Sequence, residues 1–136
     1  MVPLEEEAKP GTRSFPRDSR KILIVDNDET ILHMLKRFFD ARGYQALVER
    51  EGLKAVERIR VEKPAVVLTD IKMPSFSGVD LIQFIRQNMK DIPIIVMTAY
   101  PYLYPERRNG NEVKAYFVKP FDIDEMFSSV KRILGG

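Results

Sequence analysis

The feature that most constrains this chain is a regular alternation of short apolar runs with segments of helical period. Residues 22–25 are all aliphatic, and the runs at 65–69 and 93–97 are largely apolar as well. Runs of this kind are typical of strands that are covered on both faces. Because helix-period segments separate them, the chain is expected to build βαβ units with right-handed crossovers. The pattern therefore predicts an α/β fold, a three-layer doubly wound five-stranded parallel sheet.

The expected elements alternate along the chain. Strands are expected at 22–25, 44–48, 65–69, 93–97 and 115–118, and helices with apolar faces at 31–39, 53–59, 79–85 and 123–133. Between the last two strands, prolines and an Asn-Gly-Asn sequence at 109–111 leave room for about one helical turn, starting at Pro105. The fold is therefore expected to have a shortened or irregular fourth helix.

Composition narrows the domain organisation and the class of partner. Residues 1–20 contain three prolines among mixed charges without periodicity, so we expect a flexible tail followed by one domain at 21–136. The chain has no cysteine and a net charge of +2 that is spread along it, which excludes disulfides and argues against direct nucleic-acid binding. It also lacks a signal peptide and any apolar run near the length of a membrane span. We expect a cytoplasmic protein without membrane contact.

Polar side chains follow four of the expected strands at the point where each strand ends. Asp26, Asn27 and Asp28 follow the first strand, Asp70 the third, Thr98 the fourth and Lys119 the fifth. Asn27 or Asp28 alone could be only a helix cap or a turn residue, but parallel strands deliver their carboxyl ends to one crevice, where ligands bind. Two carboxylates about 4 Å apart repel by about 4 kcal/mol at an effective dielectric of about 20, and a bound cation can reverse this. The pattern predicts a site for a hard cation, Mg²⁺ (or Mn²⁺), and an anionic phosphoryl group.

Four segments carry a resemblance to a known family. They are Ile-Leu-Ile-Val-Asp-Asn-Asp-Glu at 22–29, Leu-Thr-Asp-Ile-Lys-Met-Pro-Ser-Phe-Ser-Gly at 68–78, Val-Met-Thr-Ala at 96–99 and Tyr-Phe-Val-Lys-Pro-Phe at 116–121. In this combination the chain resembles the receiver domain of bacterial response regulators in two-component signalling, a chemotaxis-receiver-like module with a flavodoxin-like fold. The resemblance covers residues 21–134 with all elements in order.

The resemblance implies a role for each matching residue. Asp70 would be the phosphoacceptor, a carboxylate nucleophile that forms an aspartyl-phosphate. Asp26 and Asn27 would hold the cation together with Asp70 and the backbone carbonyl of Lys72. Lys119 would pair with the phosphoryl group, and the peptide bond between Lys119 and Pro120 would be cis.

The resemblance also implies a conformational switch. Thr98 would swing to bond the phosphoryl oxygen, Tyr116 would turn inward as the threonine moves, and Ala99 would leave it room. The phosphoryl donor would be a sensor histidine kinase or a histidine phosphotransfer protein in a phosphorelay. The recipient of the signal would be a downstream protein or an output domain missing from this sequence. The domain would not be an enzyme in the ordinary sense, because it would catalyse only its own phosphorylation and dephosphorylation.

Three positions depart from the family pattern or tune it. Asn27 replaces the usual acid, so we expect weaker Mg²⁺ binding and slower phosphorylation, because an amide oxygen brings no charge. Lys72 and Tyr100 lie two residues beyond the acceptor and the threonine, where bulky side chains block the attacking water. They suggest a long-lived phosphoryl group.

Two alternative functions remain open from the sequence. A degenerate receiver would act as a phosphorylation-independent protein-binding module, as Asn27 and the irregular fourth helix would allow. The run Asp-Asn-Asp-Glu-Thr at 26–30 also fits the first motif of haloacid-dehalogenase-type phosphatases. In such an enzyme Asp26 would be the nucleophile and Asp28 the general acid/base, and the signature from Asp70 to Gly78 would go unused.

Overall fold

The apolar runs of the sequence become the strands of one parallel sheet in the order β2-β1-β3-β4-β5. The computed structural model describes residues 18–105 and 112–135. Its strands are β1 (Asp18–Val25), β2 (Gln45–Glu49), β3 (Pro64–Thr69), β4 (Ile94–Thr98) and β5 (Ala115–Val118). This strand order is that of a doubly wound sheet with a switch point between β1 and β3, as predicted.

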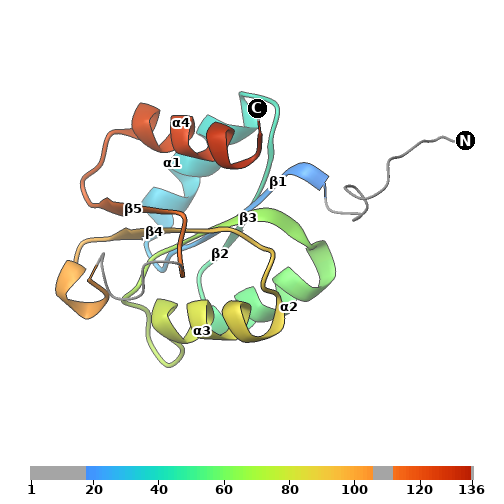
Figure 1. Cartoon of the computed structure of the whole chain (residues 1–136). Helices are drawn as coiled ribbons and strands as arrows, with labels where there is room; N and C mark the ends of the chain where they lie inside the picture. The colour runs from blue at the N-terminus through green and yellow to red at the C-terminus, as the bar shows by residue number, and fades with distance from the viewer. Residues whose placement is uncertain (1–17, 106–111, 136) are drawn as a thin grey trace, which may run out of the picture.

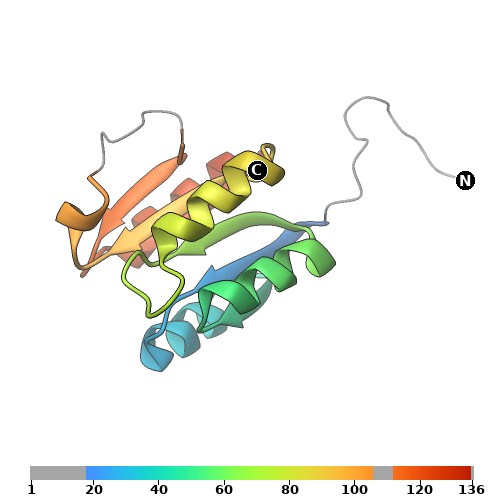
Figure 2. The ribbon, with the colours of Figure 1, turned by 90° about the horizontal axis from the view of Figure 1, so that it is seen from below.

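Four helices cover the sheet on both faces. They are α1 (Glu29–Asp40), α2 (Gly52–Glu62), α3 (Gly78–Asn88) and α4 (Ile123–Ile133). Helices α1 and α4 lie on one face, and α2 and α3 lie on the other (Figure 1). The view from below shows α2 and α3 in front of the strands (Figure 2). The expected three-layer architecture is confirmed.

Alternate side chains of each central strand enter two separate cores. In β1, Ile22 and Ile24 pack with α1 and α4, whereas Leu23 and Val25 pack with α2 and α3. All four side chains are fully buried. Because strand side chains alternate between faces, a slip of one residue would exchange the two cores. The pattern therefore fixes the register that brings the strand ends together.

The first strand begins earlier than the sequence indicated. Residues 18–20 belong to β1, since Asp18 pairs with Pro64 of β3 across a register irregularity that precedes Ile22. This part of the expected tail is therefore strand, and residues 1–17 lie outside the described residues. No helix among the described residues is long and apolar enough to cross a membrane. The cytoplasmic location stays a prediction.

Between β4 and β5, residues 99–105 and 112–114, which the structure describes, contain no α-helix. A single 3₁₀ turn, η1, spans Pro101–Leu103, and it is followed by Tyr104, whose side chain is only 2% exposed. Tyr104 packs in the core with α3 and β4. The turn expected from Pro105 falls mostly on residues 106–111, outside the described part of the chain.

Candidate functional site

A pocket lies at the carboxyl ends of the strands. The strand arrows in Figure 1 point toward these ends. Its volume is about 580 Å³. Its lining residues are Asp26, Asn27, Asp28, Ile31, Asp70, Lys72, Met73, Pro74, Ala99, Tyr100 and Lys119. Six of these were predicted as site residues, and they come from the ends of β1, β3, β4 and β5. The sheet therefore brings together side chains that are far apart in sequence.

The centre of the pocket is an ion-paired triad. The Nζ of Lys119 lies 2.6 Å from Oδ2 of Asp26 and 3.4 Å from Oδ2 of Asp70. Asp26 is fully buried, and Asp70 is 6% exposed. One ammonium thus contacts both carboxylates in a poorly hydrated position, where charges interact more strongly than in water.

Backbone amides hold the outer oxygens of the two carboxylates. Oδ1 of Asp26 accepts a hydrogen bond from the amide of Asp28 at 2.9 Å, and Oδ1 of Asp70 accepts one from the amide of Ile71 at 2.7 Å. These bonds leave the Oδ2 atoms directed at Lys119. The local turns after β1 and β3 therefore orient both carboxylates toward the same point.

Burial and charge shift the protonation equilibria of the triad. Burial raises the pKa of the Asp26 carboxyl above its ordinary value, and the hydrogen bond from Lys119 offsets only part of the rise. Burial alone would lower the pKa of the Lys119 ammonium, but the hydrogen bond and the charges of Asp26 and Asp70 outweigh it, so that pKa is raised. Lys119 therefore stays positively charged at neutral pH.

The donor set suits a hard divalent cation. Carboxylate oxygens of Asp26 and Asp70 line the pocket beside Asn27 and Lys72, and Mg²⁺ prefers oxygen ligands of this kind. Within residues 18–105 and 112–135, no group of three or more His, Cys, Asp or Glu side chains could hold a metal ion. Asn27 stands where a further acid would have extended the pair. The residues fit Mg²⁺, but with one negative charge fewer than a three-carboxylate site.

Thr98 does not line the pocket, although the next two residues, Ala99 and Tyr100, do. It is the last residue of β4 and fully buried, and its Oγ1 accepts a hydrogen bond from the amide of Tyr100 at 2.9 Å. Its backbone carbonyl accepts from the amide of Lys119 at 2.8 Å, which ties the ends of β4 and β5 together. Ala99 lines the pocket directly. The hydroxyl oxygen of Thr98 is thus engaged by the backbone that follows β4.

Tyr116 of β5 does not line the pocket and instead contacts the segment that joins β4 to β5. It is half-buried, and its hydroxyl donates to the carbonyl of Tyr104 at 2.6 Å. The two rings stack with centroids 6.5 Å apart and an interplanar angle of 21°. The hydroxyl of Tyr104 in turn donates to the carboxylate of Glu112. The structure thus links Tyr116 to the segment that follows Thr98, and not to the triad itself.

Two residues at the site make contacts that the sequence did not reveal. The ammonium of Lys72 lies 4.5 Å from the ring centroid of Tyr100, a cation–π contact between two lining residues. The sequence shows that both side chains are bulky, but only the fold places them together.

Asp28, which also lines the pocket, is a helix cap. It accepts a hydrogen bond from the amide of Thr30 at 2.9 Å and caps α1. An Asp directly before a helical pattern was the available signal for that cap.

The peptide bond between Lys119 and Pro120 is cis, as the resemblance implied. Gly78, at the end of the Asp70 signature, begins α3 and donates its amide to the carbonyl of Ile71 at 2.8 Å. A Cβ at Gly78 would overlap the carbonyl oxygen of Asp70 and lie 2.7 Å from the Cα of Ile71. Only glycine permits the loop to fold back this closely.

Comparison with known proteins identifies a family and several relatives. Residues 22–131 match the family described as the response regulator receiver domain. The chain is 36% identical over 118 residues to sporulation initiation phosphotransferase F of Bacillus subtilis, which covers 85% of this chain and 94% of that protein. It is 27% identical over 119 residues to the polar-differentiation response regulator DivK of Brucella anthropi, with 85% and 97% covered.

Solved structures with the same fold include relatives at comparable identity. The response regulator TrrA of Thermotoga maritima, crystallised in complex with Mg²⁺ and BeF, has a TM-score of 0.77 and 32% identity over 84% of this chain and 98% of that one. TrrA in complex with the histidine kinase ThkA gives a TM-score of 0.76 at 32% identity, over 85% and 99%. With the family match spanning most of the sequence and the predicted fold confirmed, this chain belongs to the response regulator receiver domains of two-component signalling.

Proposed function

We propose that this domain accepts a phosphoryl group on Asp70 and changes conformation in response. The observation that carries the proposal is the position of Lys119, whose ammonium contacts the carboxylates of both Asp26 and Asp70. A site of this charge pattern fits a phosphoryl group, which needs a nucleophilic carboxylate beside positive charge. The relative TrrA, crystallised with Mg²⁺ and BeF, supports the same function for this site.

The reaction is an in-line displacement at phosphorus. Oδ2 of Asp70 forms the new P–O bond, while the P–N bond to the donor histidine breaks and the imidazole leaves with its electron pair. Lys119 lies where its ammonium can neutralise charge on the transferred oxygens, and the amide of Ile71 holds the other oxygen of Asp70 in place. Asp26, Asn27, Asp70 and the backbone carbonyl of Lys72 would hold Mg²⁺ or Mn²⁺, and the ion would supply further positive charge. The protein's own contribution is mainly positioning.

Phosphorylation would then pull two strand ends together. It adds about −1.5 to −2 charges and three acceptor oxygens at Asp70. The hydroxyl of Thr98 would leave the amide of Tyr100 and donate to the phosphoryl group, with Ala99 leaving space for the movement. Because Tyr100 begins the segment that Tyr116 holds through its hydroxyl, rotation of Thr98 would shift this segment and Tyr116 together.

The donor that we propose is a sensor histidine kinase or a histidine phosphotransfer protein, and the recipient of the signal is a downstream protein or an output domain. The first assignment is supported by the complex of the relative TrrA with the histidine kinase ThkA. The domain is a signalling module that acts chemically only on itself.

Mass spectrometry tests the proposal directly. Incubation with acetyl phosphate and Mg²⁺ should add one phosphoryl group to Asp70, and Asp70→Asn should abolish the addition. Peptide mapping decides between the two aspartates, since label on Asp26 would instead indicate phosphatase-type chemistry.

A degenerate receiver is the second candidate, because Asn27 leaves the cation site one carboxylate short. Beryllofluoride, which mimics a phosphoryl group on an aspartate, separates the two. Binding that requires Asp70 supports a phosphoacceptor. Failure of both beryllofluoride and acetyl phosphate to react would favour a phosphorylation-independent binding module.

A further inference from the structure

A second groove, separate from the phosphoacceptor pocket, lies between α1 and the start of α4. Its volume is about 620 Å³, and it shares no lining residue with the first pocket. Met34, Phe38 and Ile123 contribute its apolar lining, and Met34 is 46% exposed. Arg37 and Arg42 also line it, both on the α1 side. The groove therefore combines an apolar surface with a basic edge.

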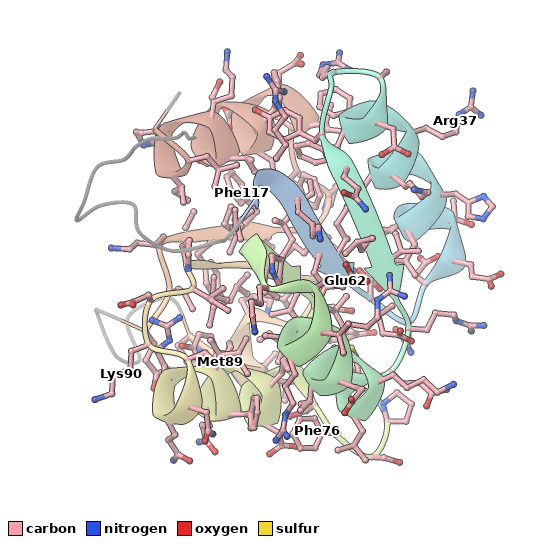
Figure 3. All side chains as sticks on the ribbon, turned by 90° about the vertical axis from the view of Figure 1, so that its right-hand side faces the viewer. Arg37, Glu62, Phe76, Met89, Lys90 and Phe117 are labelled. Atoms are coloured by element: carbon pink, nitrogen blue, oxygen red, sulfur yellow. The ribbon has the colours of Figure 1, made fainter. Side chains whose placement is uncertain are left out.

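The positive charges of Arg37 and Arg42 are not neutralised by carboxylates of the described residues. Neither forms an ion pair within the described residues. Arg42 stacks its guanidinium 3.6 Å from the ring centroid of Phe38 and donates to the carbonyl of the same residue at 3.0 Å, which fixes its position. Arg37 projects from α1 away from the sheet (Figure 3). An anionic segment would meet one fixed and one adaptable guanidinium here.

The described chain begins close to this groove. Arg20 of β1 donates from its guanidinium to the carbonyl of Gly43 at 3.0 Å, and Gly43 directly follows Arg42. The sequence upstream contains the acidic run Glu5-Glu6-Glu7 after Leu4. A dozen extended residues reach about 40 Å, whereas a helix rises only about 1.5 Å per residue. The acidic run can therefore reach both arginines with chain to spare.

We propose that the N-terminal segment around Glu5-Glu6-Glu7 docks in this groove as an intramolecular ligand. The glutamates would face Arg37 and Arg42, and Leu4 would lie on the apolar surface. Asp124 and Glu125 at the start of α4 are acidic, so they disfavour glutamates at the Ile123 end. The acidic run is therefore assigned to the arginine end of the groove.

Covalent attachment makes even a weak contact significant. A tether of about a dozen residues can give an effective concentration in the millimolar range. A contact with a millimolar dissociation constant would then be formed about half of the time. Because the contact depends on exposed ion pairs, it should weaken as the Debye length falls from about 10 Å at 0.1 M salt to about 3 Å at 1 M. The groove would be covered by its own chain at low salt, and any partner binding there would have to displace the segment.

Paramagnetic relaxation measured by NMR tests this in the full chain. The sequence has no cysteine, so Ala8→Cys gives a single site for a nitroxide label. At low salt we expect amide signals of residues 33–42 and Ile123 to broaden more than those of Leu53 and Val61, which are exposed on α2. The broadening should fade in 0.5–1 M salt.

Charge variants decide whether the contact is the one proposed. Replacing Glu5, Glu6 and Glu7 with Gln, or Arg37→Glu alone, should remove most of the selective broadening, whereas Lys54→Glu on α2 should leave it unchanged. Restoration by Lys at positions 5–7 in the Arg37→Glu background would confirm the pairing. Equal broadening of both faces, or no response to the charge variants, would overturn the proposal. A mixture of nitroxide-labelled protein without ¹⁵N and ¹⁵N protein without nitroxide reports only contacts between two copies. Broadening in this mixture as strong as in nitroxide-labelled ¹⁵N protein would also overturn the proposal, because the occupant would then be a second copy.

Discussion

At the scale of single residues, Lys119 and Asn27 together set the charge of the pocket at the strand ends. The ammonium already balances part of the charge of Asp26 and Asp70. A divalent cation therefore meets a site with a small net negative charge, since Asn27 adds none. Metal affinity at this site should be sensitive to one charge.

Asn27→Asp is expected to tighten Mg²⁺ binding about tenfold, which corresponds to about 1.4 kcal/mol. The added carboxylate would lie beside Asp26 at the edge of the same pocket and would contribute charge as well as an oxygen. Isothermal titration calorimetry on the unphosphorylated protein measures the change, with Asn27→Ala as the matched control. Equal affinities for all three proteins would show that position 27 is not a ligand.

The contact between Lys72 and Tyr100 predicts a slow loss of the phosphoryl group. Both side chains line the pocket, with the ammonium 4.5 Å from the ring centroid, and side chains of this size would restrict the approach of water. A cation–π contact at a partly exposed site contributes about 0.5–1 kcal/mol, so Tyr100→Ala should speed hydrolysis about two- to fivefold. The decay of ³²P-labelled protein measures this, with Tyr102→Ala as control. Decay of the wild-type phosphoprotein within seconds at room temperature would contradict the prediction.

At the scale of elements, the loop from β3 to α3 is held by its own backbone. Ser77 caps α3 through its side chain and Asp80 closes the capping box. Gly78 donates to Ile71 and passes against the backbone of Asp70. The position of Asp70 is therefore coupled to the first turn of a helix.

Gly78→Ala should destabilise the fold by about 1–3 kcal/mol, the typical range for overpacking. The new methyl group would overlap the carbonyl oxygen of Asp70, so phosphorylation of the folded variant should slow as well. Urea unfolding measures the first effect and acetyl phosphate labelling the second. Gly135→Ala is the comparison, because its Cβ would meet nothing within 4 Å and only its φ of 83° counts against it, at about 1 kcal/mol. Equal losses for both variants would show that the close approach has no special cost.

At the scale of the whole molecule, stability against acid depends in part on ties between elements. Asp40, at the end of α1, accepts a hydrogen bond from the amide of Ala46 in β2 at 3.1 Å and pairs with Lys36 at 3.0 Å. Slight burial would raise the pKa of Asp40, but these interactions outweigh it and the pKa is lowered. A carboxyl with a lowered pKa stabilises the fold while it is ionised, and the stabilisation is lost as pH falls through that pKa.

Asp40→Asn should therefore lower the free energy of unfolding by about 0.5 kcal/mol at pH 7, after allowance for solvent screening of an exposed pair. The difference from the wild type should shrink as pH falls below the ordinary Asp value of 3.8. Urea unfolding across pH 3–7 measures it. A difference that stays constant over this range would mean that the charge of Asp40 is not involved.

The sequence was sufficient to predict the sheet, its order of elements and the residues at the strand ends. These follow from local patterns and from the rule that parallel strands share a carboxyl edge. It was not sufficient where a residue depends on a distant partner. The early start of β1 depends on pairing of Asp18 with Pro64, and the η1 turn is fixed by burial of Tyr104 against α3. Neither partner can be identified from a single sequence by periodicity.

The burial of Tyr104 beside Tyr116 has a practical consequence for optical measurements. The protein has no tryptophan and five tyrosines, and all of these except Tyr44 lie between β4 and the end of β5. Ultraviolet-excited emission therefore arises mainly from this corner, and Tyr100 borders the pocket itself. Fluorescence of the unmodified chain therefore reports on events around the segment between β4 and β5, without any attached dye.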